Sequence, residues 1–269
     1  MELSVAGAMG PHTAYAYTGG KAFDPALPCI VFVHGALHDH SVFTLLARWF
    51  AHHGHSVLAV DLPGHGRSKG APLASVEALA DWLLALLDAA GVGQAMLVGH
   101  SMGSLIALEA TARAPQRITR LAMVGTAYPM KVSQALLATA RDEPLAAIDM
   151  VNAFTHSSHA AKPAYPGPGS WLHGGNRALM RRIQALQTGC NLFHHDFSVC
   201  DAYGAGMQAA AAVQCPVTLV LGEHDQMTRP LQAAEIGRAL NARVVTLPCG
   251  HALMAEVPDA LLRALQPEA

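Results

Sequence analysis

Short apolar runs alternate along the chain with longer segments of helical period. The runs are rich in β-branched residues and apolar on both faces, as is typical of strands buried between two layers. Strands separated by helices connect through right-handed crossovers, so the pattern predicts an α/β fold with a mostly parallel, doubly wound sheet. The predicted strands are Cys29–Val33, Ser56–Val60, Ala95–Val98, Ile118–Val124, Val217–Leu221 and Arg243–Leu247.

Five segments between or after these runs carry the apolar spacing of amphipathic helices. One of them contains the pattern LxxWLLxLL and starts at Ser75, a residue type that caps helix N-termini well. The first residues, ELSVAG and HTAYAYTGG, alternate apolar and polar positions, which predicts an antiparallel hairpin at the sheet edge. The predicted helices are 41–52, 75–90, 102–114, 230–240 and 252–265.

The stretch from Ala127 to about Val213 breaks this rhythm. It shows helical patches around 132–153 and 177–187 and no convincing strand, and KPAYPGPGSWLHGG (Lys162–Gly175) between them predicts a mobile loop. Insertions of this length between two strands of a parallel sheet are usually functional or disordered, and the helical patches here favour a folded helical cap. We therefore divide the chain into a core of residues 1–126 and 213–269 and a helical lid insertion of residues 127–212.

Composition and charge narrow the function classes. The chain has 269 residues, 52% of them hydrophobic, and a net charge of −2 without a Lys/Arg cluster, which argues against a nucleic-acid or anionic-membrane partner. The longest apolar stretch, Leu79–Val98, is interrupted by Asp81 and Asp88, and the N-terminus has no signal-peptide pattern, so we expect a cytoplasmic protein. Five cysteines without CxxC spacing predict no disulfide framework or zinc site, and the oligomeric state stays unassigned.

The sequence MLVGHSMGSLIALEA (Met96–Ala110) places a serine where a predicted strand ends and a helix begins. A serine at such a sharp turn projects its hydroxyl above the sheet, and Gly99 and Gly103 supply the small residues that the turn needs. The N-terminus of the helix that starts at Met102 then points its N–H groups at the same place. The pattern predicts Ser101 as a nucleophile.

A serine hydroxyl needs a base, and the base needs a carboxylate that orients it. Asp225 follows the strand in CPVTLVLGEHD, and His251 follows the strand in RVVTLPCGHALMAEVP. The carboxyl ends of parallel strands are where open α/β sheets carry their sites. We therefore predict Asp225 and His251 as the partners of Ser101, with Glu223 as an alternative acid.

At these residues the chain resembles the α/β-hydrolase superfamily over nearly all its length. The matching segments are HGALHDHSVF (His34–Phe43), DLPGHGRS (Asp61–Ser68), GHSMG, GEHD and GHALMAEVP. The resemblance implies a serine nucleophile at Ser101, a base at His251, an acid at Asp225, and oxyanion donors at the backbone N–H groups of Met102 and Ala36. It also implies that the insertion is a lid.

Further residues are assigned with alternatives left open. His65 and His100 lie inside motifs, where we expect them to hold loop geometry. Gly64 to Gly70 lacks GxGxxG spacing, which disfavours nucleotide binding, and the sixteen histidines include no HExxH pattern, so we predict no metal and no cofactor. Candidates for the substrate pocket, each equally open to ordinary packing, are Leu37, Met130, Phe154, Trp171, Phe193 and Met227.

The leading hypothesis is a serine hydrolase that cleaves a carboxylic ester or a related small acyl compound. Alternatives are a C–C bond hydrolase of the meta-cleavage type and a non-catalytic ligand-binding receptor on the same fold. Relatives that cleave C–C bonds usually have a glycine-rich loop after His-Gly and a Trp after the catalytic histidine. Here Leu37 and Ala252 occupy those places, which favours an uncharged acyl substrate, although Arg177, Arg181 or Arg182 could still bind a carboxylate.

Overall fold

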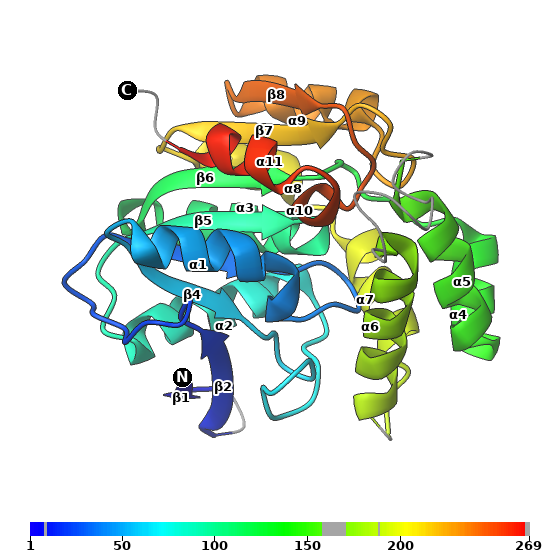
Figure 1. Cartoon of the computed structure of the whole chain (residues 1–269), viewed down its shortest axis with the longest axis horizontal. Coiled ribbons are helices and arrows are strands. Elements are labelled where there is room, and N and C mark those ends of the chain that lie inside the picture. Colours follow the sequence, from blue (N-terminus) through cyan, green and yellow to red (C-terminus); the bar gives the residue numbers. More distant parts are fainter. Residues whose placement is uncertain (8–9, 158–170, 188, 267–269) are drawn as a thin grey trace.

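The structure is a computed structural model that describes residues 1–7, 10–157, 171–187 and 189–266. These residues form an eight-stranded sheet in the order β1-β2-β4-β3-β5-β6-β7-β8 (Figure 1). The strands are β1 (Glu2–Val5), β2 (His12–Tyr17), β3 (Cys29–Val33), β4 (Ser56–Val60), β5 (Ala95–His100), β6 (Ile118–Val124), β7 (Val217–Gly222) and β8 (Arg243–Leu247).

The strand pairing confirms the predicted fold class. Strands β3 to β8 pair in parallel, while β1 pairs with β2 and β2 with β4 in antiparallel fashion. The edge hairpin and all six predicted strands are present, and β5 and β7 each continue past their predicted ends, to His100 and Gly222. The extra residues carry the chain to the edge of the sheet where the candidate site lies.

Helices cover both faces of the sheet. Because successive side chains of a strand point to opposite faces, each face packs a separate hydrophobic cluster against its helices. In β3, Ile30 and Phe32 pack with α1, α10 and α11, whereas Val31 and Val33 pack on the other face with α2, α3 and α9. The helices of the core are α1 (Thr44–His52), α2 (Val76–Ala89), α3 (Met102–Arg113), α9 (Ala234–Ala239), α10 (Leu253–Glu256) and α11 (Pro258–Leu265).

Between β6 and β7 the chain forms α4 (Gln134–Asp142), α5 (Pro144–Thr155), α6 (Leu172–Leu186), α7 (Leu192–Ala202) and α8 (Gly206–Ala212). Helices α4 to α7 stand beyond the arrowheads of β5 and β6 (Figure 1). They have a hydrophobic cluster of their own, which includes Ile148, Ile183 and Phe193 and takes in Leu37 from the core. The insertion therefore packs as a separate layer over the carboxyl ends of the strands.

The predicted loop Lys162–Gly175 is wrong at its end. Residues 162–170 lie outside the described residues, but Leu172–Gly175 form the first turn of α6. The two glycines are compatible with a helix here because Gly174 lets the ring of Trp171 lie against it: a Cβ on Gly174 would be 2.2 Å from that ring. The buried face of α6, with Met180 and Ile183, supplies the packing that two glycines do not.

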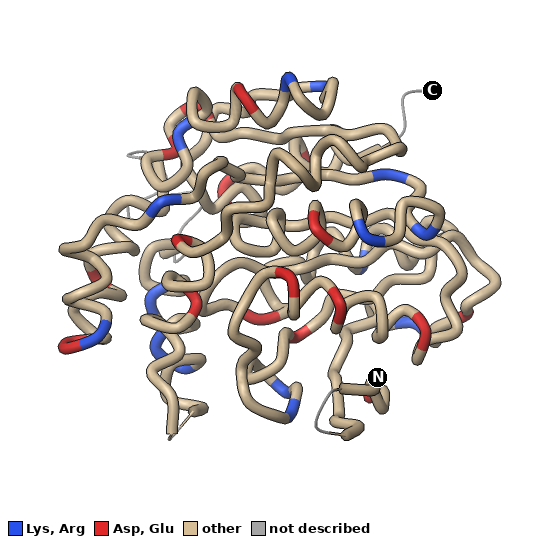
Figure 2. The backbone as a smooth tube through the Cα atoms, turned by 180° about the vertical axis from the view of Figure 1, so that it is seen from behind, with Lys and Arg blue, Asp and Glu red and all other residues tan. Residues whose placement is uncertain are grey.

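Lys and Arg positions are interspersed with Asp and Glu positions along the backbone (Figure 2). Over the described residues, no helix combines the length and the apolar character that crossing a membrane requires.

Candidate active site

Ser101 occupies a sharp turn between β5 and α3. Its backbone has φ 52° and ψ −121°, a region that L-residues rarely adopt, and its hydroxyl does not cap the helix that follows. The turn has no room for side chains at the flanking glycines. A Cβ on Gly99 would lie 2.1 Å from the Gly103 carbonyl oxygen, and a Cβ on Gly103 would lie 2.2 Å from the Val33 carbonyl oxygen.

His251 and Asp225 form a buried pair at the ends of β8 and β7. The Nδ1 atom of His251 lies 2.8 Å from Asp225 Oδ2. Asp225 also accepts hydrogen bonds from the backbone N–H groups of Met227 and Thr228, both at 2.8 Å, and from the Thr228 hydroxyl at 2.7 Å. Because the carboxylate is an acceptor, Nδ1 carries the hydrogen and Nε2 is left with its lone pair.

The environment keeps the Asp225 carboxyl ionised. Burial alone raises its pKa, but the charge of His251 and the hydrogen bonds from His251 and Thr228 outweigh burial and hold the pKa below its ordinary value. The alternative acid, Glu223, is exposed, and its side chain has no hydrogen bond or ion pair to His251 among the described residues. Of the two candidate acids, Asp225 is the carboxylate in contact with the imidazole.

The insertion and His100 fix the backbone of the histidine loop. The carbonyl of Thr155, at the end of α5, accepts hydrogen bonds from the N–H groups of His251 at 2.7 Å and Ala252 at 3.1 Å. His100 Nε2 donates to the His251 carbonyl at 2.9 Å. His100 therefore holds loop geometry, as expected, and its burial, followed by the charge of His251, lowers its pKa well below the ordinary value.

The loop after β3 lies directly against Ser101. A Cβ on Gly35 would be 3.1 Å from Ser101 Cβ. His34 accepts the Leu62 N–H at Nε2 (3.1 Å), so its Nδ1 carries the hydrogen and donates to the Gly35 carbonyl at 2.8 Å. That bond fixes the Gly35–Ala36 peptide plane, and with it the direction of the Ala36 N–H.

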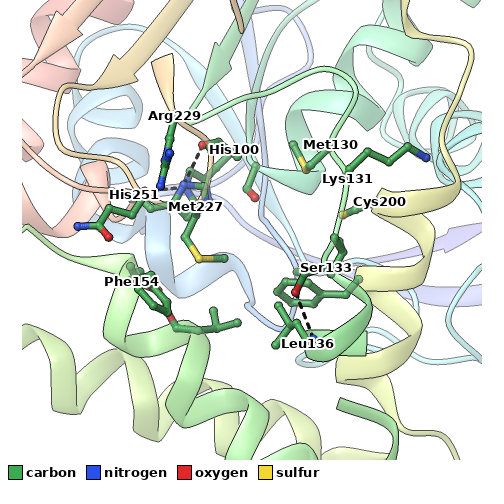
Figure 3. A pocket seen from close by; sticks show the side chains of 18 of the residues that line it. His100, Met130, Lys131, Ser133, Leu136, Phe154, Cys200, Met227, Arg229 and His251 are labelled. Atoms are coloured by element: carbon green, nitrogen blue, oxygen red, sulfur yellow. Dashed lines mark hydrogen bonds between the residues drawn. The ribbon is translucent and has the colours of Figure 1, made fainter. Parts of the chain in front are cut away.

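Ser101, His251 and Ala36 line one cavity of about 360 Å³. Figure 3 shows His251 among the side chains that line it. Of the predicted pocket residues, Met130, Phe154 and Met227 line it too, from the loops after β6 and β7 and from α5. Within the described part of the chain, the Ser101 hydroxyl makes no hydrogen bond to His251. Such contacts often tighten only when substrate binds.

Three predicted pocket residues lie elsewhere. Leu37 and Phe193 are fully buried in the hydrophobic cluster of the insertion, where Phe193 stacks on Phe197 with ring centroids 4.5 Å apart. Trp171 is 53% exposed and lines a neighbouring cavity of about 390 Å³. Apolar character alone does not distinguish a residue that packs the insertion from one that faces the cavity, and Leu37 and Phe193 belong to the first kind.

A family model described as alpha/beta hydrolase fold matches residues 28–258. The chain belongs to the α/β-hydrolase family. Relatives include the sn-1-specific diacylglycerol lipase ABHD11 of Mus musculus, 39% identical over 38% of this chain and 33% of its own length, and the esterase YbfF of Escherichia coli, 35% identical over 36% and 38%. The matched segments thus span little more than a third of these relatives.

Solved structures match this α/β-hydrolase over nearly its whole length. The enol-lactonase from Burkholderia xenovorans LB400 has a TM-score of 0.77 and 23% identity and covers 94% of this chain and 95% of its own. A thermophilic esterase has a TM-score of 0.76 and 21% identity, covering 98% and 94%. At these identities the likeness shows the shared fold alone.

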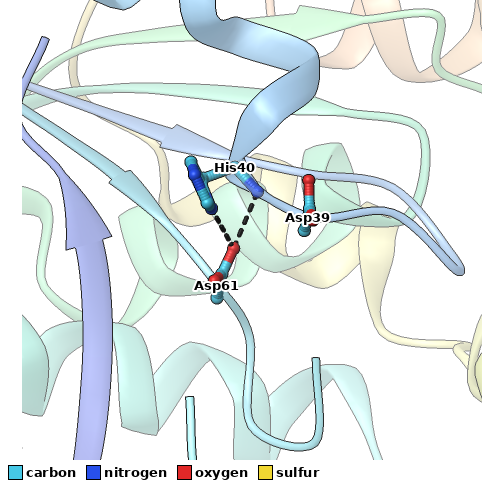
Figure 4. Close-up of side chains that lie close together, drawn as sticks. All are labelled: Asp39, His40 and Asp61. Carbon is cyan, nitrogen blue, oxygen red and sulfur yellow. Dashed lines mark hydrogen bonds and ion pairs between the residues drawn. The ribbon is translucent and has the colours of Figure 1, made fainter. Parts of the chain in front are cut away.

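A second cluster of titratable side chains, Asp39, His40 and Asp61, lies near the same edge of the hydrolase sheet (Figure 4). Protein donors already occupy its carboxylates. Asp61 Oδ1 accepts a hydrogen bond from the backbone N–H of His40 at 2.7 Å and lies 2.7 Å from His40 Nδ1. Asp61 Oδ2 accepts a hydrogen bond from the backbone N–H of Arg67 at 2.8 Å. Asp39 Oδ2 pairs with Arg182 at 2.7 Å. Asp39 Oδ1 accepts the backbone N–H of Ser41 at 2.9 Å, so each carboxylate oxygen of the cluster accepts a hydrogen bond from the protein, and the cluster ties loops together.

Sequence reasoning missed Thr228 and Arg229, which both line the cavity. Thr228 touches both members of the pair, because its hydroxyl lies 2.7 Å from Asp225 Oδ2 and 3.1 Å from His251 Nδ1. Its position three residues after an acid candidate at a strand end is the one signal in the sequence. Arg229 has no such signal, because an arginine directly before the start of a predicted helix, here at residue 230, is ordinary.

Buried neutral histidines should make the hydrolase labile to acid. Burial lowers the pKa of His34 and of His156 to about 4, and burial also lowers the pKa of His38. The unfolded chain takes up these protons near pH 6.5, so the unfolded state binds more protons between about pH 6.5 and 4, and stability falls with pH there. Each of the first two histidines accounts for about 3 kcal/mol over that interval. The raised pKa of His65 has the opposite effect on stability. The stabilisation that protonated His65 contributes is complete below the pKa of the unfolded state, and it is lost as the pH rises through the pKa of the folded state.

Urea unfolding between about pH 7 and about pH 4.5 measures this loss, and we expect the free energy of unfolding to drop by several kcal/mol. Among the described residues, neither ring nitrogen of His156 has a hydrogen-bond partner. The variant His156→Phe should therefore show a shallower dependence on pH than the wild-type chain. An unfolding free energy that is constant over this range would contradict the prediction.

Proposed function

We propose that this α/β-hydrolase cleaves carboxylic esters with small, uncharged acyl groups through an acyl-serine intermediate. The observation that carries the proposal is the convergence of Ser101 and the Asp225-oriented ring of His251 on one cavity. The lipase and the esterase among its sequence relatives support the reaction class. The same convergence argues against a ligand-binding receptor, since binding alone needs no oriented base.

In the proposed mechanism, Ser101 Oγ attacks the ester carbonyl and passes its proton to His251 Nε2. Asp225 holds the imidazole tautomer and stabilises the imidazolium. The N–H groups of Met102 and Ala36 bind the oxyanion of the tetrahedral intermediate, a contribution of about 2.7–4 kcal/mol per donor in serine hydrolases. His251 returns the proton to the departing alcohol, and water then releases the acid by the same steps.

Residues 127–212 serve as the lid in this proposal. Their helices supply much of the cavity wall, including Val151, Phe154, Met180 and Phe197. This wall excludes water from the reacting groups, and low dielectric strengthens the oxyanion contacts.

The charges near the cavity favour an ester over a dianionic C–C substrate. Arg177 and Arg181 pair with Asp149, Arg182 pairs with Asp39, and none of the three lines the cavity. Arg229 does line it, and over the described residues its guanidinium has no ion-pair partner. Lys131 lines the cavity as well, but its ammonium group donates to the Asp201 carbonyl at 2.6 Å. Because Lys131 is held by this contact, Arg229 alone is weighed against the two charges of a dianion, and the uncharged acyl compound fits better.

A side-by-side assay tests this choice. We expect kcat/KM for p-nitrophenyl acetate or butyrate to exceed that for any meta-cleavage dienol by at least about tenfold, because a substrate charge without a partner costs several kcal/mol. The Ser101→Ala variant serves as the blank. A dienol that is processed faster than every ester would support C–C hydrolysis and point to Arg229 as the carboxylate ligand.

A further inference from the structure

A buried carboxylate of the insertion reaches the loop that carries the oxyanion donor Ala36. Asp196 lies on α7 and is 1% exposed. Its Oδ2 atom accepts the backbone N–H of Leu37 at 2.8 Å and lies 2.8 Å from His65 Nε2, while its Oδ1 atom lies 3.2 Å from His195 Nδ1. The carboxylate therefore bridges two loops of the core from a helix more than 130 residues away in sequence.

The loop at Leu37 needs such a restraint. Leu37 has a φ of +56°, a left-handed conformation that a branched apolar residue holds only when its surroundings impose it. The two peptide planes that flank Ala36 are each fixed by one bond. His34 holds the Gly35 carbonyl of the first plane, and Asp196 holds the Leu37 N–H of the second. The Ala36 N–H lies in the first plane, and the second plane, which is joined to the first through the φ and ψ bonds of Ala36, limits how far the first can turn.

His65 acts as a charged partner that keeps the carboxylate in place. Its Nδ1 atom faces the Pro63 carbonyl at 3.1 Å and its Nε2 atom faces Asp196, so both ring nitrogens meet acceptors and both carry hydrogens. Burial alone lowers the pKa of His65, but the charge and hydrogen bond of Asp196 outweigh burial and raise it. The pair is a buried imidazolium–carboxylate bridge between the insertion and the core.

We propose that Asp196 is a positioning residue for the oxyanion hole: through the Leu37 N–H it sets the Ala36 donor, so that transition-state stabilisation depends on the seating of the insertion. This rests on the proposed ester hydrolysis. Removing an oxyanion donor outright costs about 10²–10³ in kcat. A donor that stays but loses its alignment should cost less, roughly 10- to 100-fold.

Two variants separate this role from a merely structural one. Asp196→Asn keeps an oxygen at the Oδ2 position for Leu37 and should retain kcat within about threefold. The double variant His65→Leu, Asp196→Leu removes the acceptor without leaving a buried charge unpaired, so it should fold. It should lower kcat roughly 10- to 100-fold for p-nitrophenyl butyrate while KM stays near the wild-type value.

The decisive readout is the affinity for an aryl trifluoromethyl ketone, whose adduct with Ser101 places an oxyanion in the hole. In the double variant this affinity should fall by about the same factor as kcat/KM, since both report the oxyanion contacts. Asp149→Asn, which breaks the surface pair with Arg177 in the same insertion, is the matched control and should match wild type in both measurements.

A folded double variant with wild-type kcat and wild-type ketone affinity would overturn the proposed role of Asp196. An Asp196→Asn variant as impaired as the double variant would also overturn it. The proposed function fails separately, by esterase activity that persists in Ser101→Ala. Circular dichroism and the urea midpoint establish that each variant is folded before its kinetics are compared.

Discussion

Replacing Ser101 with alanine is expected to lower kcat for p-nitrophenyl butyrate by roughly 10⁶-fold, the loss seen when a serine nucleophile is removed from such a site. Alanine keeps the turn between β5 and α3 but removes the only atom that bonds to the acyl group. Steady-state kinetics measure the loss, and labelling with a fluorophosphonate followed by peptide mapping locates the nucleophile. The wild-type chain should carry one label, on Ser101.

Ser198→Ala is the matched control for this substitution. Its hydroxyl donates to the His194 carbonyl within α7, away from the cavity, so the variant should keep wild-type activity and label normally. Label on another serine, or full turnover by Ser101→Ala, would refute the proposed nucleophile. Absence of both label and turnover in the folded wild-type chain would instead favour a binding protein.

The core could be predicted from the sequence because its strands are buried on both faces. All five residues of β3 are buried, and so are those of β4, so β3 is an unbroken apolar run and β4 is apolar after Ser56. The site residues followed from the same logic. Ser101 directly follows the buried strand β5, Asp225 comes shortly after the buried strand β7, and His251 comes shortly after β8, whose residues alternate between partly buried and exposed as far as Leu247. Parallel strands bring their carboxyl ends to one edge, so these three residues meet there.

The insertion was harder to predict because two of its helices lack an uninterrupted apolar stripe. In α7 the buried residues Phe193, Asp196, Val199 and Cys200 lie on one face, but the charged Asp196 stands in the middle of that face and interrupts the apolar pattern. The seven residues of α8 are mostly alanine and have no amphipathic pattern. Local sequence therefore predicted helices at 132–153 and 177–187 but missed these two.

The contacts that set the site are tertiary, and the sequence carries no sign of them. Asp196 stands in HHDFS, where nothing distinguishes it from a solvated helix residue. Its partners, Leu37 and His65, lie on two different loops of the core. Leu37 was expected to face the substrate because it is apolar and adjoins Ala36, but its left-handed backbone turns the side chain into the insertion's cluster. Only packing of the insertion on the core determines this.

Replacing Asp225 with asparagine is the second substitution for which we expect a large effect. The amide can still accept hydrogen bonds from Thr228, so the fold should persist. Its N–H₂ group, however, will face His251 Nδ1 or leave that hydrogen without a charged acceptor. The tautomer with a free Nε2 lone pair then loses its stabilisation, and kcat should fall by roughly 10⁴, as in the serine-protease case.

The comparison with Glu223→Gln decides which carboxylate does this work. Glu223 is exposed and Asp225 is 3% exposed, with its oxygens directed at His251 and at Thr228. Glu223→Gln should therefore keep kcat within about twofold, since an exposed carboxylate is screened by water. Kinetics with p-nitrophenyl butyrate, on variants shown to be folded by their urea midpoints, give the answer. Wild-type turnover by Asp225→Asn together with an inactive Glu223→Gln would show that Glu223 is the catalytic acid. The imidazole would then have to leave Asp225 during catalysis, and its hydrogen bond to Asp225 after β7 would exist only in the resting enzyme.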